Sequence, residues 1–387
     1  MSVRKRAWKT SRGIEKESWI VDYVDQQGNR RLKTFVRKKE ADTFHSTAAV
    51  EVREGTHVAD SASATVKAAG DLWIAAAHGA GLERSTTDQY RQHLNLHIVP
   101  IIGDTLLSRL TPPIIRSFED KIRKGRSVAM VRKIMTSMSS LLADAQERGL
   151  VSRNVARDLR GRRKRGKERQ ADRRQKGRVK IGVDIPSRAE IKAIVEGVKG
   201  RWRPLLLTAI FTGLRASELR GLRWVDVDFD ARAIHVRRRA DRFNAIGRPK
   251  SEAGERTVPL PPLVVNVLRE WKLACPKGEA GLVFPNGKGK VESLANIINR
   301  GLIPSQIAAG VMTQGRARYT GMHALRHFYA SWCINRREEG GLGLPAKVVQ
   351  ERLGHSSITM TLDVYGHLFP RGDDSEELAS AERSLLG

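Results

Sequence analysis

The chain has 387 residues, of which 40% are hydrophobic and 29% are charged; this apolar content suffices for packed cores and excludes a wholly disordered chain. Its 70 Lys and Arg residues outnumber its 42 Asp and Glu residues, and the net charge of +28 favours a polyanionic partner, above all nucleic acid. Two cysteines cannot form a disulfide framework or a four-thiolate zinc site. The basic N-terminus lacks the apolar stretch of a signal peptide, and no run approaches the ~18 apolar residues of a membrane span, so we expect a cytoplasmic protein.

Residues 1–58 are expected to form a small sheet-plus-helix domain. Strand-like residues at 18–24 and 30–36 flank a turn, and a helix is predicted from residue 38 to about residue 54. A basic two- or three-stranded ribbon can enter the major groove of DNA, whereas an ordinary solvated hairpin is the alternative. The candidate DNA contacts in the second strand are Arg30, Arg31 and Lys33.

Residues 60–156 are predicted to be entirely helical. The predicted helices cover residues 65–80, 85–98 and 127–148, and another begins after Thr111 with two prolines in its first turn. Pro100 and Gly103 are expected to end the second helix. The last helix carries an apolar stripe that is expected to lie in the core, formed by Val128, Val131, Met135, Met138, Leu142 and Ala145.

Residues 157–180 show the sharpest change in composition along the chain. They contain 13 Lys or Arg residues and 3 acidic residues, and no Leu, Ile, Val or aromatic residue lies between 160 and 178. Such a segment cannot build a core, so residues 157–182 are predicted to be a basic linker. A strap along DNA phosphates is favoured over a solvated tether. Its candidate DNA contacts are Arg162, Arg163, Lys164 and Arg165.

Residues 183–370 are predicted to form the largest domain, followed by an acidic tail at 371–387. Ser187 and Glu190 match a capping box at a helix start, and a buried helix is expected to break at Gly213. Helices are expected to predominate. Short strands are expected within 224–238 and 249–260. The expected fold class is therefore multidomain and mainly α with small β-sheets (α+β).

Arg215 lies in the turn that follows the buried helix. A charge beside a hydrophobic core needs a partner, and Glu218, three residues later, can supply one. From these residues alone, both a structural ion pair and an anion-binding arginine remain open.

His323 and His327 are four residues apart in a predicted helix and therefore share one face. This spacing occurs in zinc-binding helices, but Arg326 lies beside His327 and would repel a cation. An anion site formed by Arg326 and His323 fits better. A core helix with hydrogen-bonded histidines is the alternative.

Lys250, His355 and Tyr365 are the remaining candidates. Lys250 is expected at a hairpin tip, where a solvated lysine is the plain alternative, and His355 is expected to be exposed by the glycine before it. Tyr365 could be a packing residue, because a phenol is a poor nucleophile at neutral pH unless cations and a base activate it.

Together these candidates suit phosphoryl transfer without a metal or another cofactor. Two arginines can stabilise charge on the non-bridging oxygens, and a tyrosine can hold the phosphate in a covalent bond. A lysine can protonate the departing oxygen.

Four motifs, in this order, resemble the tyrosine recombinases, specifically the phage-integrase group. They are TGLRASEL, PKSEAGERTVPL, HALRH and LGHSSITMTLDVYGH, all within residues 183–370. Residues 1–156 resemble that group's N-terminal DNA-binding domains, which implies an arm-binding domain at 1–58 and a core-binding domain at 60–156. Two features depart from the family pattern: residues 335–345 are longer and more charged than usual, and the basic linker is longer.

The resemblance implies a role for each candidate. Arg215 and Arg326 match the arginines that clamp the scissile phosphate, and Glu218 matches the acid that supports the first of them. The other implied roles are Lys250 as general acid toward the 5′ hydroxyl, His323 in proton transfer and phosphate binding, His327 in support, His355 as a ligand of a phosphate oxygen, and Tyr365 as the nucleophile that forms a 3′-phosphotyrosine.

The resemblance thus implies a site-specific DNA recombinase, an integrase of a phage or mobile element that acts through a Holliday junction. The implied partners are double-stranded DNA with core and arm sites, further copies of the chain in a homotetramer on DNA, a directionality factor and a host DNA-bending protein. We expect a nucleoid-associated protein that needs no cofactor and no membrane. A type IB topoisomerase-like enzyme and a non-catalytic DNA-binding relative are the alternatives.

Overall fold

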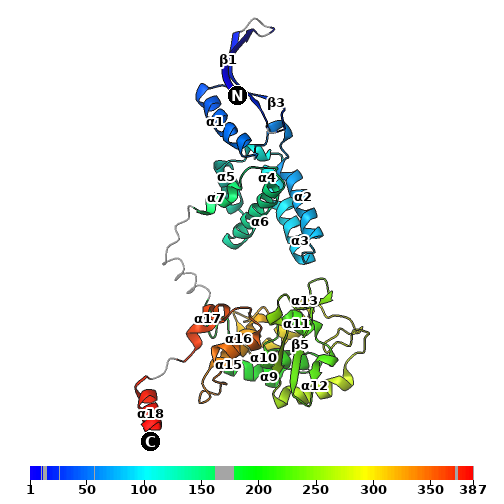
Figure 1. Ribbon diagram of the computed structural model, residues 1–387. Helices are drawn as coiled ribbons and strands as arrows, with labels where there is room; N and C mark the ends of the chain where they lie inside the picture. The colour runs from blue at the N-terminus through cyan, green and yellow to red at the C-terminus, as the bar shows by residue number, and fades with distance from the viewer. Residues whose placement is uncertain are drawn as a thin grey trace. The chain divides into compact units, whose positions relative to one another are not determined.

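The computed structural model describes residues 1–9, 11, 15–25, 27–55, 57–161, 178–370 and 374–386. The chain forms two compact units, Met1–Arg165 and Gly166–Gly387. The chain is mainly helical with small antiparallel sheets (Figure 1), which confirms the predicted fold class.

A three-stranded antiparallel sheet opens the first unit, in the order β1-β2-β3. Its elements are β1 (Ser2–Lys9), β2 (Glu15–Val24), β3 (Arg30–Phe35) and the helix α1 (Lys38–Arg53), which packs on one face. Val21 and Tyr23 of β2 and Ala41 of α1 form the centre of the small core. The two strands and the helix predicted here are confirmed, and β1 is the third strand of the ribbon.

Helices form the rest of the first unit. They are α2 (Val66–Gly79), α3 (Arg84–His93), α4 (Val99–Ile102), α5 (Pro112–Arg123), α6 (Val128–Glu147) and α7 (Val155–Gly161). Their shared core includes Phe118, Ile134 and Leu141. The stripe predicted along α6 lies in this core except for Val128, which is exposed at the first helical position.

The predicted helix end at Pro100 is wrong. A π-helical turn, η2 (Leu94–Ile98), carries α3 directly into α4, where Pro100 occupies the first turn. Proline is tolerated in a first turn, where the missing N–H group costs little. The helical segment ends at Gly103, as predicted.

The second unit contains small antiparallel sheets. The first has the order β4-β5-β8, and the others pair β6 with β7 and β9 with β10. The strands are β4 (Val227–Asp228), β5 (Ala233–Val236), β6 (Arg239–Ala240), β7 (Ile246–Gly247), β8 (Arg256–Pro259), β9 (Met312–Thr313) and β10 (Arg316–Ala317). The strands predicted within 224–238 and 249–260 are confirmed.

The other elements of the second unit are mostly helices (Figure 1). They are α9 (Arg188–Gly197), α10 (Trp202–Thr212), α11 (Ala216–Gly221), α12 (Pro262–Ala274), α13 (Leu294–Asn296), α14 (Ile303–Ala308), α15 (His323–Ile334), α16 (Ala346–Leu353), α17 (Ile358–Tyr365) and α18 (Asp374–Leu386). The capping box predicted at Ser187 and Glu190 is present at the start of α9. None of the described helices is both long and apolar enough to cross a membrane.

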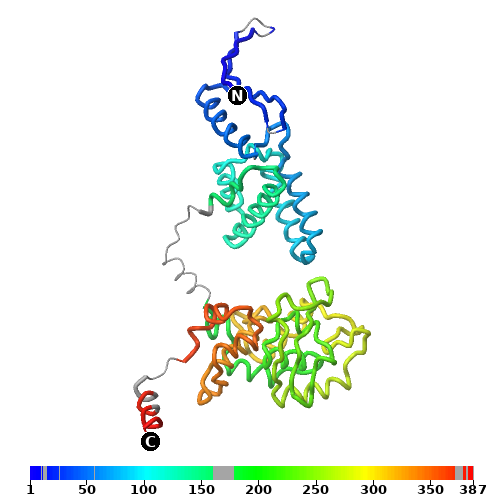
Figure 2. Tube along the Cα trace, viewed as in Figure 1, coloured from blue at the N-terminus to red at the C-terminus, as the bar shows by residue number. Residues whose placement is uncertain are grey.

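The helix α10 lies at the centre of the second unit. It is apolar on all sides, so it is stable only when other elements surround it. Its leucines are buried, and it packs against α12 and α15. Near its first described residues this unit also contacts the segment that follows α17, because His367 Nε2 lies 2.8 Å from the Val179 carbonyl oxygen. In Figure 2 the green trace at the start of the unit correspondingly lies beside the red trace of α17. This core fixes the elements that carry the candidate site.

Candidate active site

Arg215 lies in the turn that leads from α10 to α11. The turn needs glycine at position 213, because Gly213 has a φ of +61° and a Cβ atom there would lie 2.3 Å from the Tyr329 ring. Arg215 then serves as the N-terminal flanking residue of α11. Its guanidinium donates to Glu218 at 2.7 Å and to the Gly354 carbonyl at 2.9 Å. About one third of the side chain is exposed, so it can reach a ligand.

Glu218 is the buried acid beside this arginine. Its two oxygens accept hydrogen bonds from Arg215 and also from Arg256, at 2.8 Å for the closest Arg256 contact. Burial alone would raise the pKa of Glu218, but the charge and hydrogen bonds of Arg256 and the charge of Arg215 lower it to about 2. The carboxylate therefore stays ionised at neutral pH and holds both guanidiniums.

Arg326 lies in the first turn of α15 and is only 2% exposed. It donates to the Gly213 carbonyl at 2.7 Å and to the Leu353 carbonyl at 2.5 Å. Burial, together with the charge of Arg215, lowers the pKa of Arg326 to about 9, which still leaves the guanidinium protonated at neutral pH. Both predicted arginines thus belong to one cluster, in which their guanidiniums donate hydrogen bonds to backbone carbonyls at the C-terminal ends of α10 and α16.

The two histidines of α15 lie together, as their spacing predicted. Their ring centroids are 4.6 Å apart, with His323 exposed and His327 half-buried. His327 Nδ1 lies 2.7 Å from the Tyr365 hydroxyl. Burial and the neighbouring His323 and Arg326 lower the pKa of His327 to about 4, so the ring is neutral at pH 7. A neutral ring can accept the phenol proton at Nδ1.

Tyr365 ends α17 and is 2% exposed. Burial raises the pKa of its phenol to about 12, although Arg326 and Arg215 act in the opposite direction. The phenol is therefore protonated at neutral pH, and cleavage chemistry at this oxygen would need a proton acceptor.

His355 is buried, so the predicted exposure of this ring is wrong. Gly354 turns the chain with a φ of +63°, and His355 Nδ1 then lies 2.9 Å from the Thr361 hydroxyl of α17. The ring is nearly parallel to that of Tyr365, at a centroid distance of 6.4 Å. Burial and the nearby Arg326 and Arg215 lower the pKa of His355 to about 3, so it too is neutral.

Lys250 is a catalytic candidate on a surface loop. It is exposed in the loop between β7 and β8. These strands belong to different sheets, because β7 pairs with β6 and β8 pairs with β5, so the predicted hairpin tip is wrong. The lysine therefore lies on a surface loop that joins two different sheets.

Arg256 was missed by the sequence analysis. It lies on β8, and its side chain is 6% exposed beside Glu218. The sequence held one local signal, because the alternation along this strand favours Val258 as the inward residue and Arg256 shares its face. This alternation indicates that Arg256 faces inward, but it does not identify Glu218, in another segment, as its partner.

The predicted DNA contacts of β3 point to different faces. Arg30 is exposed and pairs with Asp22 at 2.9 Å. Arg31 and Lys33 instead lie half-buried on the face that α1 covers, with ion pairs to Asp25 at 2.8 Å and Asp60 at 3.0 Å. Lys33 also lies 4.4 Å from the centre of the Phe44 ring of α1. The contacts predicted in the linker, namely Arg162, Arg163, Lys164 and Arg165, lie outside the described residues.

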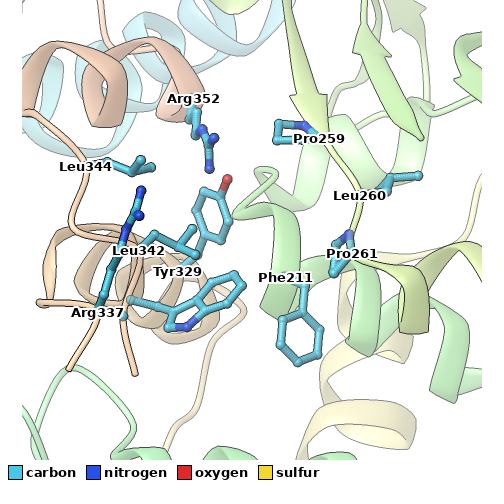
Figure 3. A pocket seen from close by; sticks show the side chains of 11 residues that line it. Phe211, Pro259, Leu260, Pro261, Tyr329, Arg337, Leu342, Leu344 and Arg352 are labelled. Carbon is cyan, nitrogen blue, oxygen red and sulfur yellow. The ribbon is translucent and has the colours of Figure 1, made fainter. Parts of the chain in front are cut away.

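A separate cavity of about 440 Å³ opens in the second unit (Figure 3). Its wall is mostly apolar and includes Tyr329, Trp332 and Leu342, together with Arg337 and Arg352. None of the predicted site residues lines it. Within the described part of the chain, no group of three or more His, Cys, Asp or Glu side chains is arranged to hold a metal ion.

Comparison with known proteins bears on what this cluster does. Residues 187–371 match the phage integrase family, and residues 66–162 match the phage integrase central domain. A tyrosine recombinase XerC-like protein of Caldanaerobacter subterraneus is 27% identical over 373 residues, which cover 90% of this chain and 90% of that protein.

Two solved structures have a similar fold. One is the Tn1549 transposon integrase in complex with a circular intermediate DNA, with a TM-score of 0.61 and 18% identity over 82% of this chain and 99% of that chain. The other is a lambda integrase tetramer bound to a Holliday junction, with a TM-score of 0.56 and 16% identity over 91% of this chain and 96% of that chain. Since the two matched family segments span more than half of the sequence, the chain belongs to the phage integrase family and is a tyrosine recombinase, as its four motifs predicted.

Proposed function

We propose that this site-specific DNA recombinase breaks and rejoins DNA strands with Tyr365 as its nucleophile. The observation that carries the proposal is the convergence of two arginines, Arg215 and Arg326, on the α16 end while the Tyr365 hydroxyl is held by a neutral histidine. Two guanidiniums supply the charge that a phosphoryl-transfer transition state needs on its non-bridging oxygens.

The proposed cleavage step is a transesterification. The Tyr365 oxygen attacks the scissile phosphorus, the bond from phosphorus to the 5′ oxygen breaks, and a 3′-phosphotyrosine forms. Lys250 donates a proton to the departing 5′ oxygen. Rejoining is the reverse reaction with the 5′ hydroxyl of another strand, so the bond energy is conserved and the number of phosphodiester bonds does not change.

The contacts support His327 as the group that takes the phenol proton, because its Nδ1 is the atom hydrogen-bonded to Tyr365. His323 is assigned to phosphate binding and to passing this proton to solvent, since its ring is exposed and adjacent to His327. His355 is assigned to a phosphate oxygen through Nε2, because Nδ1 is already bonded to Thr361. Tyr365 must leave the buried position to reach a phosphate, so DNA binding is expected to shift α17.

The proposed substrate is double-stranded DNA with core and arm sites. The second unit and the helical part of the first unit are assigned to the core site, and the sheet β1-β2-β3 is assigned to the arm site. On that sheet, Arg30 is proposed to contact DNA. Arg31 and Lys33 are instead proposed to stabilise the domain through their ion pairs. The linker arginines and lysine remain proposed phosphate contacts.

We further propose that four copies act together through a Holliday junction, which is the state of the lambda integrase structure with a similar fold. A directionality factor and a host DNA-bending protein are proposed partners, and the nucleoid is the proposed location. The product would be the integrated or excised DNA of a phage or mobile element.

The proposal is tested with two substrates. A suicide core-site duplex, in which cleavage releases a short strand, is expected to trap wild-type protein as a covalent 3′ adduct. A pair of attachment sites on one plasmid is expected to recombine. Relaxation of supercoils by single copies without recombination would instead indicate a topoisomerase-like enzyme, and binding without any adduct would indicate a non-catalytic relative.

A further inference from the structure

The C-terminal end of α16 collects three arginines. The last carbonyls of a helix have no intrahelical partner and carry partial negative charge, so they attract cations. Here three consecutive carbonyls each accept from a different guanidinium. The pairs are Arg256 Nε with the Arg352 carbonyl at 2.7 Å, Arg326 Nη2 with the Leu353 carbonyl at 2.5 Å, and Arg215 Nη2 with the Gly354 carbonyl at 2.9 Å.

Two of these arginines are the proposed phosphate clamp, and the third is not. Arg256 also donates to both oxygens of Glu218, at 3.2 Å and 2.8 Å. Glu218 uses the same two oxygens to hold the backbone N–H and the guanidinium of Arg215. The buried carboxylate therefore lies between the guanidiniums of Arg256 and Arg215.

Arg256 thus joins three segments that are distant in the sequence. It starts β8, six residues after Lys250, and it binds α11 through Glu218 and the α16 end through the Arg352 carbonyl. The fit is close, because a Cβ atom on Gly354 would lie 2.7 Å from the Ala253 carbonyl and 2.9 Å from Arg256 Nη1. The planar fork of Arg256 reaches Glu218 and the Arg352 carbonyl at the same time.

We propose that Arg256 is a positioning residue for DNA cleavage, which fixes Glu218 and the end of α16 so that Arg215 is aimed at the scissile phosphate. This inference rests on the proposed function of the cluster. Without Arg256, the full charge of Glu218 acts on Arg215 alone, and the Arg352 carbonyl loses its donor. Arg215 is then drawn toward Glu218 and away from the Gly354 carbonyl that orients it. Small displacements of a charge-stabilising group lower the rate of the chemical step strongly.

The test compares Arg256→Gln and Arg256→Lys with the wild type in single-turnover cleavage of suicide core sites. Arg220→Gln is the matched control, because Arg220 is also a buried arginine that bridges segments, through the carbonyls of Glu292 and Asp241, but does not contact Glu218. Each protein is assayed on three DNAs that differ only at the scissile linkage: the natural phosphate, a 5′-bridging phosphorothiolate and a methylphosphonate. Thermal unfolding and DNA affinity are measured in parallel.

On natural DNA we expect Arg256→Gln to cleave roughly 10–100-fold more slowly, with DNA affinity changed by no more than a few-fold, and Arg256→Lys to lie between it and the wild type. The slower cleavage by Arg256→Gln should persist on the phosphorothiolate, because the substitution does not impair protonation of the leaving group. It should shrink on the methylphosphonate, which carries one negative charge fewer for Arg215 to stabilise. Arg220→Gln should show the same rate relative to wild type on all three DNAs.

Two results would overturn the inference. An equal loss on all three linkages would show that Arg256 only supports folding or DNA binding, and rescue by the phosphorothiolate would show that it acts through Lys250. If Arg256→Gln does not fold, Arg256→Lys gives the same comparison. Failure of the proposed function is distinguishable, because then the wild type itself would form no covalent adduct.

Discussion

The Tyr365 hydroxyl and the Nδ1 atom of His327 lie 2.7 Å apart inside the second unit. The pKa of the phenol is about 12 and that of the imidazole is about 4, so at neutral pH the phenol is the donor and the ring is the acceptor. This arrangement keeps the phenol of Tyr365, the proposed nucleophile, protonated and buried. It also places the atom that can receive its proton at hydrogen-bond distance.

His327→Gln is therefore expected to slow single-turnover cleavage by about 10²-fold or more, since Gln can accept the phenol hydrogen bond but cannot take the proton. DNA affinity should be unchanged. His367→Gln is the matched control, because His367 follows on the same segment but bonds the Val179 carbonyl. Cleavage by His327→Gln at the wild-type rate would remove His327 from the proton path.

Lys250→Ala is expected to slow cleavage of natural DNA strongly and to recover much of the rate on a 5′-bridging phosphorothiolate. A sulfur leaving group needs no proton, so the missing general acid matters less. The rates of strand release on the two DNAs are compared for mutant and wild type. If the cleavage rate of Lys250→Ala does not recover on the phosphorothiolate, Lys250 would act in phosphate binding instead.

The buried His355 predicts how stability depends on pH. Its pKa is about 3 in the folded chain and 6.5 as the reference value, so between these values the unfolded chain binds more protons. This contribution to stability is complete above pH 6.5 and is lost as the pH falls toward 3. In urea unfolding followed between pH 7 and pH 4, His355→Asn should lose less stability than the wild type. Parallel curves for the two proteins would contradict burial of this ring.

Replacement of Arg162, Arg163, Lys164 and Arg165 by Ser is expected to weaken core-site binding similarly for all DNA sequences. If all four bind phosphates, the slope of log affinity against log salt should fall by roughly 2–4, since each contact contributes about 0.9. Base preference should stay the same, because phosphate contacts carry no sequence information. Salt titrations on specific and scrambled DNA test this, and an unchanged slope would make the linker a tether.

Local patterns predicted much of the fold. The capping box at Ser187 and Glu190 and the break at Gly213 depend on residues within one turn, so the sequence determines them directly. The prediction that Pro100 ends a helix was wrong because a π-helical turn before it shifts the helical register. Nothing in the local sequence pattern indicates that turn.

The candidate site was predicted as a set of residues but not as a set of contacts. The motifs identify His355, yet its burial depends on Thr361 in the helix that follows the turn. Arg256 was missed because its partners, Glu218 and the end of α16, come from segments 38 and 96 residues away. Arg31 was assigned to DNA because a strand pattern alone does not say which face a helix covers.

The most direct test of the mechanism is the identity of the residue that becomes joined to DNA. Wild-type protein and Tyr365→Phe are incubated with a suicide core-site duplex, and the adduct is digested and mapped by mass spectrometry. We expect a 3′-linked nucleotide on Tyr365 in the wild type and no adduct with Tyr365→Phe, while both bind the DNA with affinities within a few-fold. A covalent adduct formed by Tyr365→Phe, or a nucleotide found on any other residue, would contradict the proposed mechanism.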